Sequence, residues 1–119
     1  MTPRELKGNH VLLRIFIGES DKVGHKPLYM EVLERARRSG MAGCTVLRGI
    51  AGFGASSVVH SDHAFKLSSD LPIVIEIVDT AEHIQRFHEE VDPILEGGLV
   101  TEERAVVRHY RRRGDAGNP

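Results

Sequence analysis

The segment Pro72–Val78, PIVIEIV, constrains the fold most, because β-branched residues dominate it. Such density is typical of a strand in the middle of a sheet. The segment Val11–Ile17, VLLRIFI, is a second nearly unbroken apolar run and is followed by Gly18. We expect it to form a strand that is covered on both faces. The two segments together predict a sheet as the framework of the chain.

A first helix is predicted between these strands. It begins near Pro27, since proline is tolerated at the first helical position, and it ends near Ser39. Gly40 follows and can adopt the left-handed conformation that closes a helix. The apolar positions that share one face of this helix are Leu28, Val32, Leu33 and Ala36.

A second helix is predicted after Pro72–Val78. Asp79 is the expected N-cap, with Glu82 in the capping-box position three residues later. Pro93 should kink or tighten the last turn, and glycines follow shortly afterwards. One apolar stripe runs along this helix through Ile84, Phe87, Val91 and Leu95.

The remaining strands complete the order strand, helix, strand, strand, helix, strand. The candidates are Ala42–Ile50 and a last strand from Val100 through Ala105–Tyr110, while Ser56–Leu67 forms an extra arm. This order predicts an α+β protein with a ferredoxin-like βαββαβ plan and an extended loop or hairpin arm between strands 2 and 3. We expect one domain over residues 11–110, an N-terminal extension over 1–10 and a basic, disordered tail over 111–119.

Composition excludes several classes of protein. The length of 119 residues suits one compact domain, and Cys44, the only cysteine, cannot form an internal disulfide. No apolar stretch approaches the roughly 18 residues that a membrane span requires. A net charge of -1 argues against a dedicated nucleic-acid binder. We therefore expect a cytoplasmic protein without nucleic-acid binding or direct membrane insertion.

Three glycines cluster in the segment TVLRGIAGFGASS, at Gly49, Gly52 and Gly54. A backbone that turns sharply and presents N–H groups to an anion needs glycine, because a Cβ blocks the approach. A β-bulge or strand corner also uses glycines and needs no ligand. The segment is neither a P-loop nor a Rossmann fingerprint, since no Lys-Ser or Lys-Thr follows and the glycine order differs.

Polar residues at the ends of predicted strands are further binding candidates. Glu19, Ser20 and Asp21 could hydrogen-bond a ribose or a base, and Lys22 could neutralise a phosphate. The alternative is a polar loop that caps the first helix. Arg48 is a possible phosphate partner, although an exposed arginine is more often solvated.

Histidines and carboxylates give no clear catalytic or metal site. His60 and His63 are the nearest histidine pair, but strand alternation places them on opposite faces unless a turn lies between them. Glu102 and Glu103 form an adjacent pair on a surface that is expected to be solvated. We predict no enzymatic activity.

Five motifs occur in an order and spacing that resemble a known family. They are LLRIFIGESDK, KPLY, TVLRGIAGFG, SSDLPIVIEIVD and EGGLVTEE. Together they resemble the PII-like family catalogued as domain of unknown function 190, over roughly Val11–Tyr110. The resemblance implies a ferredoxin-like protomer, a homotrimer, and kinship with PII signalling proteins, which bind adenine nucleotides in clefts between subunits.

The resemblance also implies site residues. Gly52, Phe53 and Gly54 match a GFG at the base of the flexible loop of PII proteins. Gly97 and Gly98 match a second loop that folds over phosphates in those proteins. This loop is flanked here by acidic residues, which favours AMP or ADP over ATP as the ligand.

Several functions remain open at this point. The first is a trimeric regulator that binds an adenine nucleotide and presents the loop over residues 49–67 to a transporter, channel or enzyme. The second is a ligand-free trimeric scaffold, and the third is a metal-responsive trimer of the cation-tolerance type with an ion at His60 and His63. Arg111–Arg113 could reach an anionic site, or form a solvated tail.

Overall fold

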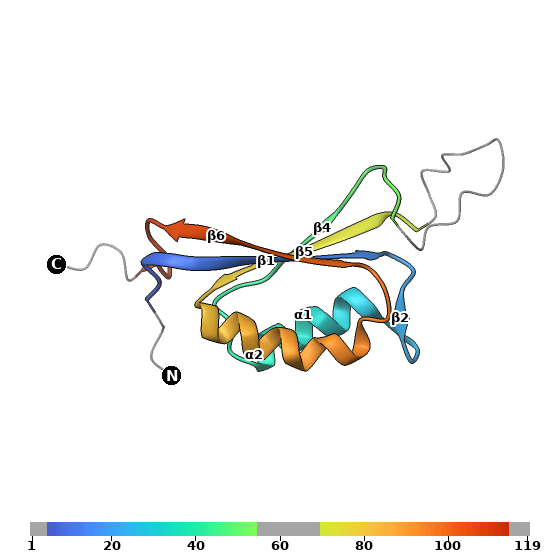
Figure 1. The fold of residues 1–119 in the computed structure, drawn as a ribbon, viewed down its shortest axis with the longest axis horizontal. Helices are drawn as coiled ribbons and strands as arrows, with labels where there is room; N and C mark the ends of the chain where they lie inside the picture. Colours follow the sequence, from blue (N-terminus) through green and yellow to red (C-terminus); the bar gives the residue numbers. More distant parts are fainter. Residues whose placement is uncertain (1–4, 55–69, 115–119) are drawn as a thin grey trace.

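The computed structural model describes residues 5–54 and 70–114. A four-stranded antiparallel sheet in the order β4-β5-β1-β6 is covered on one face by two helices (Figure 1). This is the α+β, ferredoxin-like βαββαβ plan that the element order predicts. The elements are β1 (Gly8–Gly18), β2 (Lys22–Val23), β3 (Lys26–Pro27), α1 (Leu28–Arg38), β4 (Thr45–Arg48), β5 (Pro72–Asp79), α2 (Ala81–Val91), the 3-10 turn η1 (Asp92–Ile94) and β6 (Leu99–Val107).

The two strands that the sequence predicts most clearly are the two central ones. β1 pairs with β5 from Val11 opposite Asp79 to Gly18 opposite Pro72. Alternate residues of both strands are fully buried, which is the pattern of a sheet with one packed face. The expectation that Val11–Ile17 is covered on both faces is wrong for the single chain, because both helices lie on the same side.

The hydrophobic core lies between this face of the sheet and the helices. The strands β1 and β5 and the helices α1 and α2 each contribute three side chains, at a spacing of two in the strands and of three or four in the helices. These residues are Leu13, Ile15, Ile17, Leu28, Val32, Ala36, Ile73, Ile75, Ile77, Ile84, Phe87 and Val91. The apolar faces predicted for both helices are confirmed with two exceptions: Leu33 is only partly buried, and Leu95 lies beyond the end of α2 and is also only partly buried.

The start of α2 differs from the prediction by one residue. Thr80 is the N-cap, and its hydroxyl accepts a hydrogen bond from the backbone N–H of His83 at 3.1 Å. Asp79 is instead wholly buried and accepts hydrogen bonds from the backbone N–H groups of Ala42 and Thr80. The carboxylate thus ties the end of β5 to the segment that leads into β4. At the other end of α2, the chain tightens into η1 at Pro93, as predicted.

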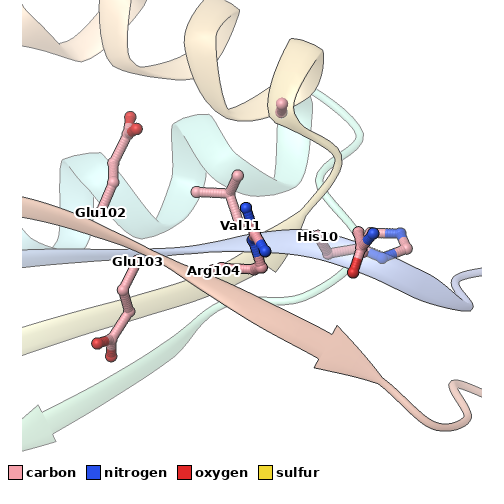
Figure 2. A pocket seen from close by; sticks show the side chains of 7 residues that line it. His10, Val11, Glu102, Glu103 and Arg104 are labelled. Carbon is pink, nitrogen blue, oxygen red and sulfur yellow. The ribbon is translucent and has the colours of Figure 1, made fainter.

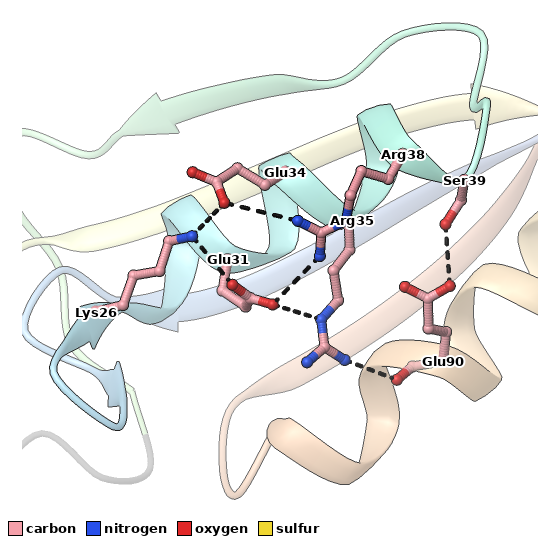
Figure 3. Close-up of polar contacts among 7 residues, drawn as sticks. All are labelled: Lys26, Glu31, Glu34, Arg35, Arg38, Ser39 and Glu90. Atoms are coloured by element: carbon pink, nitrogen blue, oxygen red, sulfur yellow. Dashed lines mark hydrogen bonds and ion pairs between the residues drawn. The ribbon is translucent and has the colours of Figure 1, made fainter.

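A network of ion pairs joins the helical layer (Figure 3). Glu31 accepts a hydrogen bond from Arg35 at 2.7 Å and pairs with Lys26 at 3.1 Å, and these two cations lower the pKa of Glu31. Arg35 also donates to the backbone oxygen of Glu90 in α2. The network connects α1 to α2 and to the small β2–β3 hairpin, which sequence periodicity did not predict because each strand has only two residues.

Two further predictions concern the region around β4. Gly40 closes α1 with a φ of 73°, as expected. β4 is shorter than the predicted strand Ala42–Ile50. The predicted arm Ser56–Leu67 lies outside the described residues.

None of the described helices is long and apolar enough to span a membrane.

The N-cap assignment leads to a stability prediction. Thr80→Ala removes the acceptor for the His83 N–H and should lower the free energy of unfolding by about 1 kcal/mol. Thr80→Ser keeps a hydroxyl at the same position and should stay within about 0.5 kcal/mol of wild type. Urea unfolding monitored by circular dichroism measures both. Equal losses in the two variants would contradict the capping role.

Candidate functional site

Four segments that are far apart in the sequence meet at one end of the sheet. The antiparallel register brings the end of β1, the start of β5 and the start of β6 together there, and the chain that leaves β4 joins them. These segments enclose a cavity of about 420 Å³. Its lining consists of Phe16, Ile17, Gly18, Asp21, Gly52, Phe53, Gly54, Asp70, Pro72, Gly98 and Leu99.

The loops around this cavity are held by backbone contacts and by two carboxylates. Asp21 accepts a hydrogen bond from the backbone N–H of Gly18 at 2.9 Å. Asp70 accepts one from the backbone N–H of Ser20 at 3.0 Å. The N–H of Glu19 donates to the carbonyl oxygen of Leu71 at 2.8 Å. The loop after β1 and the segment before β5 therefore form one connected unit.

Two glycines are required by the way the chain packs here. Gly98 has a φ of 101°, and a Cβ there would press against the carbonyl oxygen of Phe16. Gly49 donates its N–H to the carbonyl oxygen of Pro72 at 2.7 Å, and a Cβ would lie 2.7 Å from the proline ring. These residues let the turns before β6 and after β4 approach the neighbouring strands closely.

Some of the residues predicted as a binding site come together at this cavity. Gly52, Phe53, Gly54 and Gly98 line it, and Phe53 is 79% exposed. Gly49 donates its N–H to the carbonyl oxygen of Pro72, which lines the cavity. The backbone N–H of Ser20 donates to the carboxylate of Asp70, another lining residue.

Other predicted residues do not line the cavity. Arg48 forms an ion pair with Glu19, so its charge is already partnered by a carboxylate. Lys22 lies in the β2–β3 hairpin, and Gly97 lies in the turn before Gly98 without lining the cavity.

The charge of the cavity lining differs from the expectation of a phosphate cradle. Among the described residues that line it, the charged groups are the two carboxylates of Asp21 and Asp70, and none is a lysine or an arginine. Sequence reasoning missed Asp70 altogether. The available signal was an aspartate two residues before the strand that begins at Pro72, but only the strand register places it beside Gly18 and Ser20.

A second hollow lies between β1, β6 and the start of α2 (Figure 2). Glu102 and Glu103 both line it, but Figure 2 shows that their side chains project to opposite sides of the strand. Glu103 is also paired with Arg14 at 2.6 Å. The adjacent carboxylates therefore do not form a pair for acid–base chemistry.

Cys44 lines a third hollow, on the open face of the sheet. Burial raises the pKa of its thiol to about 11, so the thiol remains protonated at neutral pH. Tyr110 closes the same region by donating its hydroxyl to the carbonyl oxygen of Ala42. Cys44 thus packs against the core and is a poor nucleophile.

No group of three or more His, Cys, Asp or Glu side chains is arranged to hold a metal ion within residues 5–54 and 70–114. The pair His60 and His63, which carries the metal hypothesis, lies outside the described residues.

The glycine packing leads to a prediction. Gly98→Ala should lower the free energy of unfolding by roughly 1 to 3 kcal/mol, because of its positive φ and the clash with Phe16. Gly54→Ala should cost less than about 0.5 kcal/mol, since a Cβ there meets no atom of the described residues within 4 Å. Thermal unfolding by calorimetry compares the two variants. A Gly54→Ala loss as large as that of Gly98→Ala would contradict this account.

Comparison with solved structures shows the fold. The chain superposes on CPII from Thiomonas intermedia K12, a structure bound to ADP, AMP and acetate, with a TM-score of 0.60 and 19% identity, over 87% of this chain and 91% of that one. A PII-like signaling protein from Thermus thermophilus gives a TM-score of 0.59 and 16% identity, over 85% and 91%. The fold of this chain is therefore PII-like.

Comparison of sequences shows the family. The DUF190 model, described as "Uncharacterized ACR, COG1993", matches residues 10–107. A UPF0166 protein of Aquifex aeolicus (strain VF5) is 42% identical over 96 residues, which are 81% of this chain and 91% of the relative. A UPF0166 protein of Methanocaldococcus jannaschii is 39% identical over 75 residues, 63% and 68% of the two chains. The chain belongs to the DUF190 family.

Proposed function

We propose that this protein is a PII-like regulatory protein without enzymatic activity. It acts in the cytoplasm as a homotrimer and binds an adenine nucleotide in clefts between subunits. AMP and ADP bind in preference to ATP, and the loop over residues 49–67 contacts a transporter, a channel or an enzyme. The family, the fold and the ligands of CPII support this proposal.

The observation that carries the proposal is the cavity at the end of the sheet. The glycines of the GFG segment, which the resemblance assigns to the ligand-responsive loop, line the same cavity as Gly98 of the second assigned loop. Phe53 stands between the two GFG glycines and presents an exposed ring. An exposed aromatic ring next to a cavity is a stacking surface for a base, because every base has a π-face.

The charges around the cavity support the preference for fewer phosphates. Asp21 and Asp70 line it, and Glu19 partners the nearby Arg48. A triphosphate would bring additional negative charge next to these carboxylates without a lysine or arginine in the described lining. A mono- or diphosphate carries less charge and can direct it to solvent.

The open face of the sheet supports the proposed assembly. No described helix covers this face, and Leu47 and Leu99 are 47% and 56% exposed on it. Phe16 lies between them in the pairing of β1 with β6 and β5. An exposed apolar face of this kind is typical of an interface between subunits.

Exposed apolar residues also support a protein partner. Ile50 is 88% exposed in the segment that leaves β4, and Phe53 follows three residues later. Both lie at the start of the loop over residues 49–67. A ligand that contacts Phe53 would change what this segment presents to a partner.

Titration calorimetry tests nucleotide binding. AMP and ADP should bind at least about threefold more tightly than ATP, because of the carboxylates in the lining. Phe53→Ala should weaken AMP binding roughly 5- to 100-fold through the loss of base stacking. Ile50→Ala, an equally exposed apolar truncation outside the cavity lining, should leave binding unchanged. Absence of heat with all three nucleotides at millimolar concentration would favour the ligand-free scaffold.

Light scattering coupled to gel filtration tests the assembly. The wild type should have the mass of a trimer, whereas Leu47→Asp should be monomeric at micromolar concentration, because a buried carboxylate would lie in the interface. Its circular dichroism should match wild type, since Leu47 is half exposed in the single chain. Ala81→Asp adds the same charge at the N-terminus of α2, where it is tolerated, and should remain trimeric.

A further inference from the structure

The cavity at the end of the sheet is lined by two carboxylates that hold the loops and still have acceptor capacity. Asp21 uses Oδ2 to accept from the N–H of Gly18, and Asp70 uses Oδ1 to accept from the N–H of Ser20. No described residue donates to the second oxygen of either group. A carboxylate has about four acceptor positions, so each can accept further hydrogen bonds.

The two carboxylates lie close to each other at one point of the chain. A Cβ built on Gly18 would be 2.5 Å from Oδ1 of Asp70 and 3.3 Å from Oδ1 of Asp21. Gly18 therefore leaves room for both groups, and they converge on the same side of the loop after β1. Asp70 reaches this place from a backbone with a φ of 53°, which is uncommon for a residue with a side chain.

We propose that Asp21 and Asp70 bind the ribose of the nucleotide through its 2′- and 3′-hydroxyls. This inference rests on the proposed nucleotide binding and deepens it. Two neighbouring hydroxyls are donors that match two convergent carboxylates, and O–H···O⁻ hydrogen bonds are among the stronger ones in proteins. Acidic side chains bind ribose hydroxyls in the same way in dinucleotide folds.

The same arrangement sets the direction of the ligand. A phosphate group placed beside Asp21 and Asp70 would be repelled, so the phosphates leave the cavity toward solvent. The base then lies on the side of Phe53, which also lines the cavity. The site therefore selects a ribonucleotide with a free vicinal diol, and the diol is the feature that this chain recognises directly.

Calorimetry with AMP and 2′,3′-dideoxy-AMP tests the inference on the wild-type protein. The dideoxy compound should bind roughly 10- to 100-fold more weakly, as expected for the loss of hydrogen bonds to charged groups. If it binds within threefold of AMP, the inference is overturned and the proposed nucleotide binding stands. If no adenine compound binds, both are overturned.

A double variant tests the two carboxylates themselves. Asp21→Asn with Asp70→Asn keeps an oxygen for each backbone hydrogen bond, and asparagine tolerates the positive φ of Asp70. AMP and the dideoxy compound should then bind within about threefold of each other, because the charged acceptors are gone. Asp92→Asn changes an exposed aspartate outside the cavity and should keep the wild-type difference. If the double variant still binds AMP as much more tightly than the dideoxy compound as the wild type does, the inference is overturned. If the double variant does not fold, the comparison of the two compounds on the wild-type protein decides the inference.

Discussion

The antiparallel pairing of β1 with β5 is the interaction on which the rest of the structure depends. It joins residues that are about sixty positions apart and places Gly18 opposite Pro72. Alternate aliphatic side chains of both strands then face the helices, and together they form the sheet side of the apolar core. The same register brings the loop after β1 to the segment before β5, so the cavity is a direct consequence of the central pairing. A shift by one residue would turn the buried isoleucines outward and separate Asp70 from Ser20.

The helices cover only one face of this sheet, and the other face has a mixed character. Arg14 at its centre pairs with Glu76 at 2.8 Å and with Glu103, and these ion pairs link β5, β1 and β6. Leu47 and Leu99 lie nearer the cavity and remain half exposed. An assembly through this face would bury apolar side chains next to the cavity, and it would therefore couple subunit association to the loops that surround the proposed ligand. Such a coupling would give the proposed ligand a physical means of changing the surface offered to the proposed partner.

Much of the fold was predictable because hydrophobic periodicity is a local property. The β-branched density of Pro72–Val78 and the helical spacing of Ile84, Phe87 and Val91 identify a strand and a helix without any knowledge of their neighbours. The prediction failed where a choice depends on distant partners. Asp79 resembles an N-cap in sequence, but its carboxylate is buried against Ala42, so Thr80 caps the helix instead. Coverage of Val11–Ile17 on one face rather than two likewise depends on where the helices pack.

The sequence by itself determined the two helices, the central strands β1 and β5, the family and the glycines that allow tight turns, since each of these depends on neighbouring residues or on ordered motifs. It also indicated Gly52–Gly54 and Gly98 as residues of one site. Only the tertiary structure decided which charges line that site, because Asp21 and Asp70 become neighbours through strand pairing, whereas Arg48 is engaged by Glu19. The polarity of a cavity is the sum of groups from separate segments, and that sum exists only after the chain has folded.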